Sequence, residues 1–184
     1  MELLDALTQT FDYTSKTVAG IRADQLNAAT PCTQWDVCAL VAHTIGVVKN
    51  MGLGVSGGEL LPDINAITLD DDFAAQFRTE ADRTLKAWTA RGLEGEVNVG
   101  AGPMPAMAGL SINLVDTATH SWDIARATGQ AESLPDDVAA TVLAVCKGFV
   151  TEEIRGFAGF SAEVQLGPTA TNTERLVAFL GRQP

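Results

Sequence analysis

The chain has 184 residues, 46% of them hydrophobic, which is enough to bury one core of ordinary size. Its 12 basic and 23 acidic residues give a formal charge of −11, which repels nucleic acid and anionic membrane surfaces. We therefore expect a single domain over residues 1–184, with no nucleic-acid partner and no membrane partner. The amino terminus lacks the basic and apolar regions of a signal peptide, and no apolar run approaches membrane-spanning length, so a cytoplasmic protein is predicted.

The cysteines give no sign of a disulfide framework. There are three of them, Cys32, Cys38 and Cys146, an odd number without CxxC spacing, so neither paired disulfides nor a zinc ribbon is predicted. Cys32 lies near the amino end of a predicted helix, where the helix dipole can lower a thiol pKa. Reduced, structural cysteines are nevertheless the expectation, because a free cysteine usually packs as a small hydrophobe.

Helical periodicity dominates the first half of the chain. An amphipathic helix is predicted over residues 2–19, with Gly20 as its stop. A second helix is expected to start near Trp35, because Thr33 and Asp36 resemble a capping box. A glycine-rich segment then opens a long loop that reaches to about residue 69. Three aspartates at 70–72 favour the start of a third helix, which Gly92 closes.

The second half continues the helical pattern with two interruptions. The segment EGEVNVG suits a short strand, GPMPAM is read as a loop, and a central helix is predicted from about residue 106 to 128. A further amphipathic helix follows as one segment to about residue 156, and SAEVQL could form a second short strand. Thr171 with Glu174 predicts a capping box before a short terminal helix. The expected fold class is all-α: a four-helix bundle with a short extra C-terminal helix and one or two minor β-strands.

The most informative stretch is VDTATHSWDIARATG, residues 115–129. His120 is one of only two histidines, and Asp116, four residues earlier, lies on the same helix face. Asp123 continues that polar stripe. Apolar residues lie on both sides of it: Leu110, Val115, Trp122 and Ile124. A helix with this pattern is usually buried, and buried charge must be paired, hydrogen-bonded or bound to metal.

His43, on the second helix, completes a set of metal-ligand residue types. Two facing helices of a bundle would deliver His43, Asp116 and His120 to one place. Two imidazoles and one carboxylate leave coordination positions open, as in catalytic zinc sites and in the facial triad of non-haem iron. The other interpretation is a hydrogen-bonded core histidine with Asp116 as its acceptor, and the spacing alone leaves both open.

Three segments carry a resemblance to a known family. TPCTQWDVCALVAHTIG, VDTATHSWDIARATG and the ending ERLVAFLGRQP resemble the actinobacterial branch of the DinB-like metal-binding superfamily. That branch is similar to the metal-binding domain of mycothiol-dependent maleylpyruvate isomerase. The resemblance implies a DinB-like four-helix bundle with one divalent metal, usually zinc and sometimes nickel, held by His43, Asp116 and His120. Relatives commonly have Glu or His where Asp116 stands, as the third ligand. The isomerase also carries an extra carboxy-terminal domain that this chain is too short to contain in full, so isomerisation of maleylpyruvate itself is not expected.

Three functions follow as hypotheses. In the first, implied by the resemblance, the metal activates a small-molecule thiol such as mycothiol toward an electrophilic substrate, as in an S-transferase or isomerase. The second is metal-dependent hydrolysis, with Asp123 as the available base. The third is a non-catalytic binding protein, with or without metal, in which the site is vestigial and a homodimer is one assembly to consider. Asp123 is otherwise read as a partner of Arg126 or as a residue that orients a histidine, and Trp35 and Trp122 as core or pocket-wall residues.

Overall fold

The structure, a computed structural model, describes residues 1–131, 133–157 and 160–184. Helices and strands follow one another in this order: α1 (Leu3–Ala19), a 3-10 turn η1 (Ala23–Gln25), α2 (Val37–Val55), α3 (Phe73–Arg91), β1 (Glu96–Asn98), β2 (Pro103–Pro105), α4 (Ala106–Thr128), α5 (Asp136–Phe149), α6 (Glu152–Phe157) and α7 (Asn172–Phe179).

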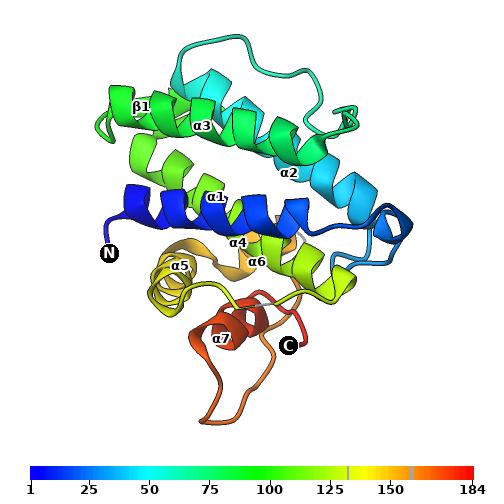
Figure 1. Cartoon of the computed structure of the whole chain (residues 1–184). Coiled ribbons are helices and arrows are strands. Elements are labelled where there is room, and N and C mark those ends of the chain that lie inside the picture. Colours follow the sequence, from blue (N-terminus) through cyan, green and yellow to red (C-terminus); the bar gives the residue numbers. More distant parts are fainter. Residues whose placement is uncertain (132, 158–159) are drawn as a thin grey trace.

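Helices α1, α2, α3 and α4 form the bundle. Helix α1 packs on α3 and α4, and α2 packs on the same two helices, so each bundle helix has two neighbours (Figure 1). Helix α5 lies outside the bundle against α1 and α4 and carries α7 on its far side. The predicted all-α class, a DinB-like four-helix bundle with a short extra C-terminal helix and a minor sheet, is confirmed.

Burial of regularly spaced apolar side chains explains why the bundle helices pack as they do. Phe11 of α1 meets Phe77 of α3 edge to face, with ring centroids 6.0 Å apart, and both are fully buried. Helix α4 is buried on most of its faces, as expected for a helix between α1, α2 and α5. Helix α2 is long and apolar enough to cross a membrane, contrary to our expectation for any apolar run, but 67% of that window is buried inside the protein.

Several local predictions were wrong. Asp36, rather than Thr33, caps α2, because its carboxylate accepts the backbone N–H of Ala39 at 2.8 Å. The segment read as a loop supplies β2, which pairs antiparallel with β1 through Val97 and Met104. The helix expected as one segment to residue 156 is divided into α5 and α6, and residues 161–166, expected as a strand, have no regular structure.

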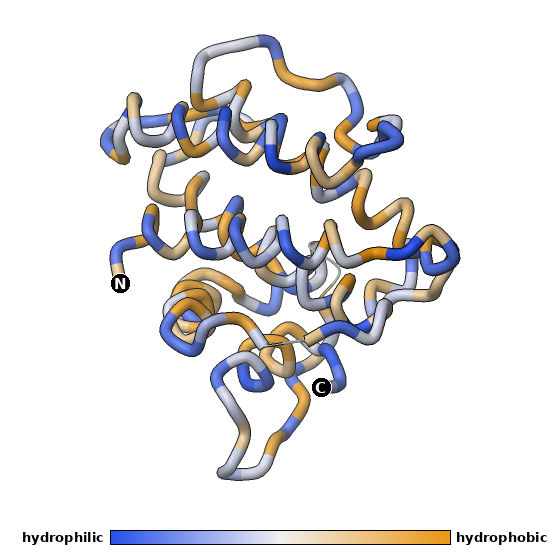
Figure 2. The backbone as a smooth tube through the Cα atoms, viewed as in Figure 1, coloured by the Kyte–Doolittle hydropathy of each residue, from blue (hydrophilic) through white to orange (hydrophobic). Residues whose placement is uncertain are grey.

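The long loop after α2 is held down on the bundle. Asn50 of α2 accepts the backbone N–H of Leu61 in this loop at 2.9 Å, and its amide also donates to the carbonyl of Val99, which follows β1. A side chain at Gly46 would overlap the backbone oxygen of Ile64, so only glycine admits the loop this close to the helix. Ile64, Ile67 and Leu69 of the loop pack against the core. Figure 2 shows orange, apolar segments along the same loop.

Candidate metal centre

The helices bring together the three residues that the sequence singled out. His43 comes from α2, and Asp116 and His120 lie one turn apart on α4. Asp116 Oδ2 lies 3.6 Å from His43 Nε2 and 3.7 Å from His120 Nε2. The ligand atoms of these three residues all lie within 4.8 Å of one another. The predicted convergence of the two histidine-bearing helices therefore exists in the fold.

The spacing and charge of this cluster fit a divalent cation. Both distances exceed a hydrogen bond, yet they are close to the roughly 3.4 Å that separates ligand atoms around a tetrahedral zinc with metal–ligand distances of about 2.1 Å. The second oxygen of Asp116, Oδ1, is buried without a hydrogen-bond partner among the described residues. A buried carboxylate oxygen that no protein group satisfies is what a cation would compensate.

His43 is oriented by the long loop. Its Nδ1–H donates to Oδ1 of Asn65 at 2.7 Å. Because an amide oxygen only accepts, this bond places the proton on Nδ1 and leaves the Nε2 lone pair facing Asp116. The Trp35 ring stacks on the imidazole with centroids 4.3 Å apart and covers one face of it, whereas Trp122 is a core residue.

His120 is oriented by a charged pair. Its Nδ1–H donates to Oδ2 of Asp123 at 3.1 Å. Asp123 is fully buried and also accepts from Arg182, whose Nη2 lies 2.9 Å from Oδ2 and whose Nε lies 3.2 Å from Oδ1. Asp123 was expected to pair with Arg126, and this was wrong. The arginine that binds the Asp123 carboxylate is Arg182, whereas Arg126 lies over the Trp122 ring. The alternative reading, that Asp123 orients a histidine, matches this geometry.

The charges of the cluster shift its pKa values in a consistent pattern. Burial raises the pKa of Asp116, but the nearby His120 and His43 lower it by more, so the net pKa is lowered. Burial likewise opposes ionisation of Asp123, and the hydrogen bonds from His120 and Arg182 lower its pKa nonetheless. Burial lowers the pKa of His43, while Asp116 and Asn65 raise it to a net increase. Both carboxylates are thus held ionised. With both imidazoles neutral, the two carboxylates and the Arg182 guanidinium sum to a charge of −1.

Cys32 was not expected at the site, but it lies beside it. Its sulfur is within 4.8 Å of ligand atoms of His120 and Asp123, so the structure contains a second group of metal-ligand types. Burial and the charge of Asp123 raise the pKa of this thiol. Burial also raises the pKa of Cys146 to about 12, which agrees with the structural role expected for the cysteines.

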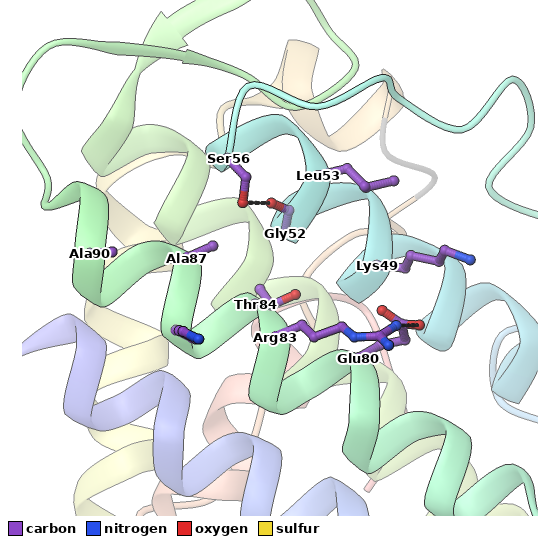
Figure 3. Close-up of a pocket in the computed structure, with 10 residues that line it drawn as sticks. Lys49, Gly52, Leu53, Ser56, Glu80, Arg83, Thr84, Ala87 and Ala90 are labelled. Carbon is purple, nitrogen blue, oxygen red and sulfur yellow. Dashed lines mark hydrogen bonds and ion pairs between the residues drawn. The ribbon is translucent and has the colours of Figure 1, made fainter.

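A groove between α2 and α3 lies elsewhere and shares no residue with the cluster. It has a volume of about 540 Å³ and a floor of small and apolar residues that includes Gly52, Ala87 and Ala90 (Figure 3). Some of its polar side chains are paired, since Arg83 binds Glu80 at 2.9 Å and the Thr84 hydroxyl donates to the Val48 carbonyl, and Lys49 and Lys86 also line it. Among the described residues, no buried side-chain polar atom without a partner lies in this groove, in contrast to Asp116 Oδ1 in the cluster.

The bundle and its inward-facing histidines and aspartate define the class of protein, a DinB-like helical bundle. Residues 7–125 match the mycothiol maleylpyruvate isomerase N-terminal domain family, and the chain belongs to that family. Two solved structures share the fold: mycothiol-dependent maleylpyruvate isomerase, at 17% identity, and a histidine-to-alanine mutant of mycothiol-dependent maleylpyruvate isomerase, at 18%. Each alignment covers 78% of this chain and 68% of the other, with a TM-score of 0.56.

Two relatives match over nearly the whole chain. They are the uncharacterized proteins MT0763 and Rv0738 of Mycobacterium tuberculosis, from strains CDC 1551 / Oshkosh and ATCC 25618 / H37Rv. Each is 28% identical over 184 residues, covering 99% of this chain and 98% of the relative. The resemblance stated from the sequence motifs is confirmed at the level of the family by the match of residues 7–125 to the family model.

Proposed function

We propose that this protein binds one divalent metal through His43, Asp116 and His120 and uses it in a thiol-dependent transfer or isomerisation. The observation that carries the proposal is the convergence of two Nε2 atoms on Asp116, which has one buried oxygen without a partner. Each histidine is held through Nδ1, so that its Nε2 lone pair is available. Zinc suits two imidazoles and a carboxylate best, with nickel or iron as alternatives.

The residues leave room for a further ligand on one side. The side chain of Asp116 is 22% exposed, whereas each imidazole is 10% exposed, so we place the approach of a small molecule on the Asp116 side. When bound, a divalent cation supplies a Lewis acid that lowers the pKa of a thiol or water held beside it. The protein's own contribution is to fix both imidazoles and to shield them with the Trp35 ring.

A small-molecule thiol is the proposed first substrate. The related structures are named as mycothiol-dependent enzymes, and this chain shares their fold and family. In the proposed reaction the thiol sulfur attacks an electrophilic second substrate. If the outcome is isomerisation, the new carbon–sulfur bond breaks again and the thiol recovers its proton. If the outcome is transfer, that bond stays, and the electron pair displaced on the electrophile departs with a leaving group or takes up the thiol's proton. The proposal includes a single domain over residues 1–184, a cytoplasmic location, and a homodimer as one assembly to test.

Hydrolysis is less well supported than thiol chemistry. A hydrolase would need a base near the bound water, and Asp123 was the only acidic residue that the sequence offered for that role. Both oxygens of Asp123 are occupied by Arg182 and His120, and its side chain is fully buried. A carboxylate in that position orients a neighbour and does not face a solvent-derived nucleophile.

The test begins with metal content. Protein purified without a histidine tag should contain close to one divalent metal per chain by elemental analysis. Adding a low-molecular-weight thiol to cobalt-substituted protein should then produce a sulfur-to-metal charge-transfer band, which should persist in Cys32→Ser. A protein that takes up no metal would support the vestigial interpretation. If added thiol does not change the spectrum of the cobalt-substituted protein, the thiol-dependent function is excluded.

A further inference from the structure

His120 belongs to two overlapping groups of metal-ligand residues. One group joins it to His43 and Asp116, and the other joins it to Cys32 and Asp123, with ligand atoms within 4.8 Å in both cases. By residue type alone the second group is a serious competitor, because thiolate is a strong zinc ligand and a bound cation favours the deprotonated thiol. Something in the protein must therefore determine which group takes the ion.

Arg182 occupies the competing group. Its guanidinium contacts both oxygens of Asp123, at 3.2 Å and 2.9 Å, and His120 Nδ1 shares Oδ2 at 3.1 Å. A cation could reach Asp123 only by displacing that guanidinium, and its positive charge opposes a second cation nearby. Asp123 is thereby reserved as an acceptor for the imidazole.

The arginine is built into this position by the end of the chain. Gly181 follows α7 with φ +83°, and a side chain there would overlap Ser161, so glycine is required at the turn. The Arg182 backbone N–H then donates to Val177 O at 2.9 Å. The side chain lies over the Phe160 ring and is only 9% exposed. Arg182 is therefore held in place beside Asp123 and is not a mobile surface arginine.

We propose that Arg182 is a positioning residue that selects the ligand group. By holding Asp123, it fixes His120 Nδ1–H, directs Nε2 toward His43 and Asp116, and keeps the ion off Cys32. The proposal rests on the proposed metal site. It concerns where the ion sits, whatever reaction follows.

Cobalt spectroscopy without added thiol tests this directly. Wild type should show cobalt d–d bands and no sulfur-to-cobalt charge-transfer band. Arg182→Gln should gain that band, and the double variant Arg182→Gln with Cys32→Ser should lose it again, because Cys32 is its only proposed source. Arg182→Lys, which keeps the positive charge, should restore the wild-type spectrum at least in part.

Arg155→Gln is the matched control. Arg155 is also buried near the end of α7, where it donates to the carbonyls of Phe179 and Ser161, but its recorded bonds do not include Asp123. This variant should loosen the same region without creating the sulfur band. A band in Arg155→Gln as strong as in Arg182→Gln would overturn the proposal, because general loosening would then explain it.

One further measurement uses wild-type protein and so does not depend on whether a variant folds. X-ray absorption of the metal-loaded protein should show only nitrogen and oxygen neighbours, and a sulfur neighbour would overturn the selection of the His43 group. An Arg182→Gln spectrum identical to wild type would overturn it as well. Absence of cobalt binding in wild type would instead refute the metal site itself, so the two failures are distinguishable.

Discussion

The two histidines present the same ring nitrogen to Asp116, but the protein holds them by different means. His43 donates to the neutral amide of Asn65, which belongs to the loop between α2 and α3. His120 donates to the buried carboxylate of Asp123, which Arg182 fixes from the far end of the chain. A carboxylate partner raises the basicity of a ligating imidazole more than an amide does. The comparison predicts a strong, rigid ligand on α4 and a weaker, more adaptable one on α2.

Removing a ligand should have the largest effect. His120→Ala and His43→Ala should each weaken metal binding by at least about 100-fold, with His120→Ala the more severe because it removes the ligand whose basicity a buried carboxylate raises. Asp116→Ala should be the mildest of the three, since water can replace a carboxylate that binds through one oxygen. Elemental analysis measures occupancy, and circular dichroism checks that the bundle remains helical. If His120→Ala and His43→Ala lost equal amounts of metal, the proposed difference between the two histidines would be wrong.

Asp123 and Asn65 support the two histidines through Nδ1. Replacing either support should have a smaller effect than removing a ligand, and it tests the difference between the two histidines more directly. Asp123→Asn should weaken metal binding by about 10- to 100-fold and destabilise the fold by about 3–5 kcal/mol, because Arg182 is left buried without its counter-charge. Asn65→Ala should cost about 1 kcal/mol and weaken binding less, because it removes one neutral hydrogen bond. Metal titration and urea unfolding measure the two quantities.

A control for these two variants is available at the surface. Asn172 donates to Asp136 at 2.9 Å in an exposed pair far from either histidine in the chain. Asn172→Ala should change metal binding by less than either support variant. If Asn65→Ala weakened binding more than Asp123→Asn did, the loop would be the dominant support and the comparison would have to be reversed.

The sequence was most informative where a signal repeats along the chain. The boundaries of α4 were predicted correctly, because apolar periodicity marks its length and Gly129 marks its end. The capping box of Thr171 and Glu174 was also predicted correctly, since both residues lie within one turn. The shared face of Asp116 and His120 was predictable for the same reason, because one helix positions both residues.

The supporting residues could not be read in this way. Asn65 is 22 residues from His43, and Arg182 is 59 residues from Asp123, so no helical or strand period links either pair. Asn65 lies in a loop without a motif, and Arg182 stood in the quoted ending without any assigned role. Cys32 was judged from its place along one helix, whereas its importance comes from its distance to α4. These contacts depend on packing between elements, which a single sequence does not specify.

The smallest predicted effect uses helix caps to loosen one support at a time. Thr171 caps α7, which leads to Arg182, and Asp72 caps α3, which follows the loop that carries Asn65. Thr171→Ala and Asp72→Ala should each cost about 1 kcal/mol of stability, because each leaves a helix N-terminus without its acceptor. Metal binding should fall by less than about threefold in either variant, which corresponds to less than about 0.7 kcal/mol.

The two cap variants should differ in which histidine responds. The chain contains only two histidines, so their imidazole ¹⁵N resonances give one pair of signals each in the metal-free protein. Thr171→Ala should shift the His120 signals and leave those of His43 in place, because the disturbance passes through Arg182 and Asp123. Asp72→Ala should do the reverse through Asn65. If either variant shifted the ¹⁵N signals of both histidines equally, the two supports would be mechanically coupled. His43, held by the loop, and His120, held through Arg182, would then not differ in the way proposed.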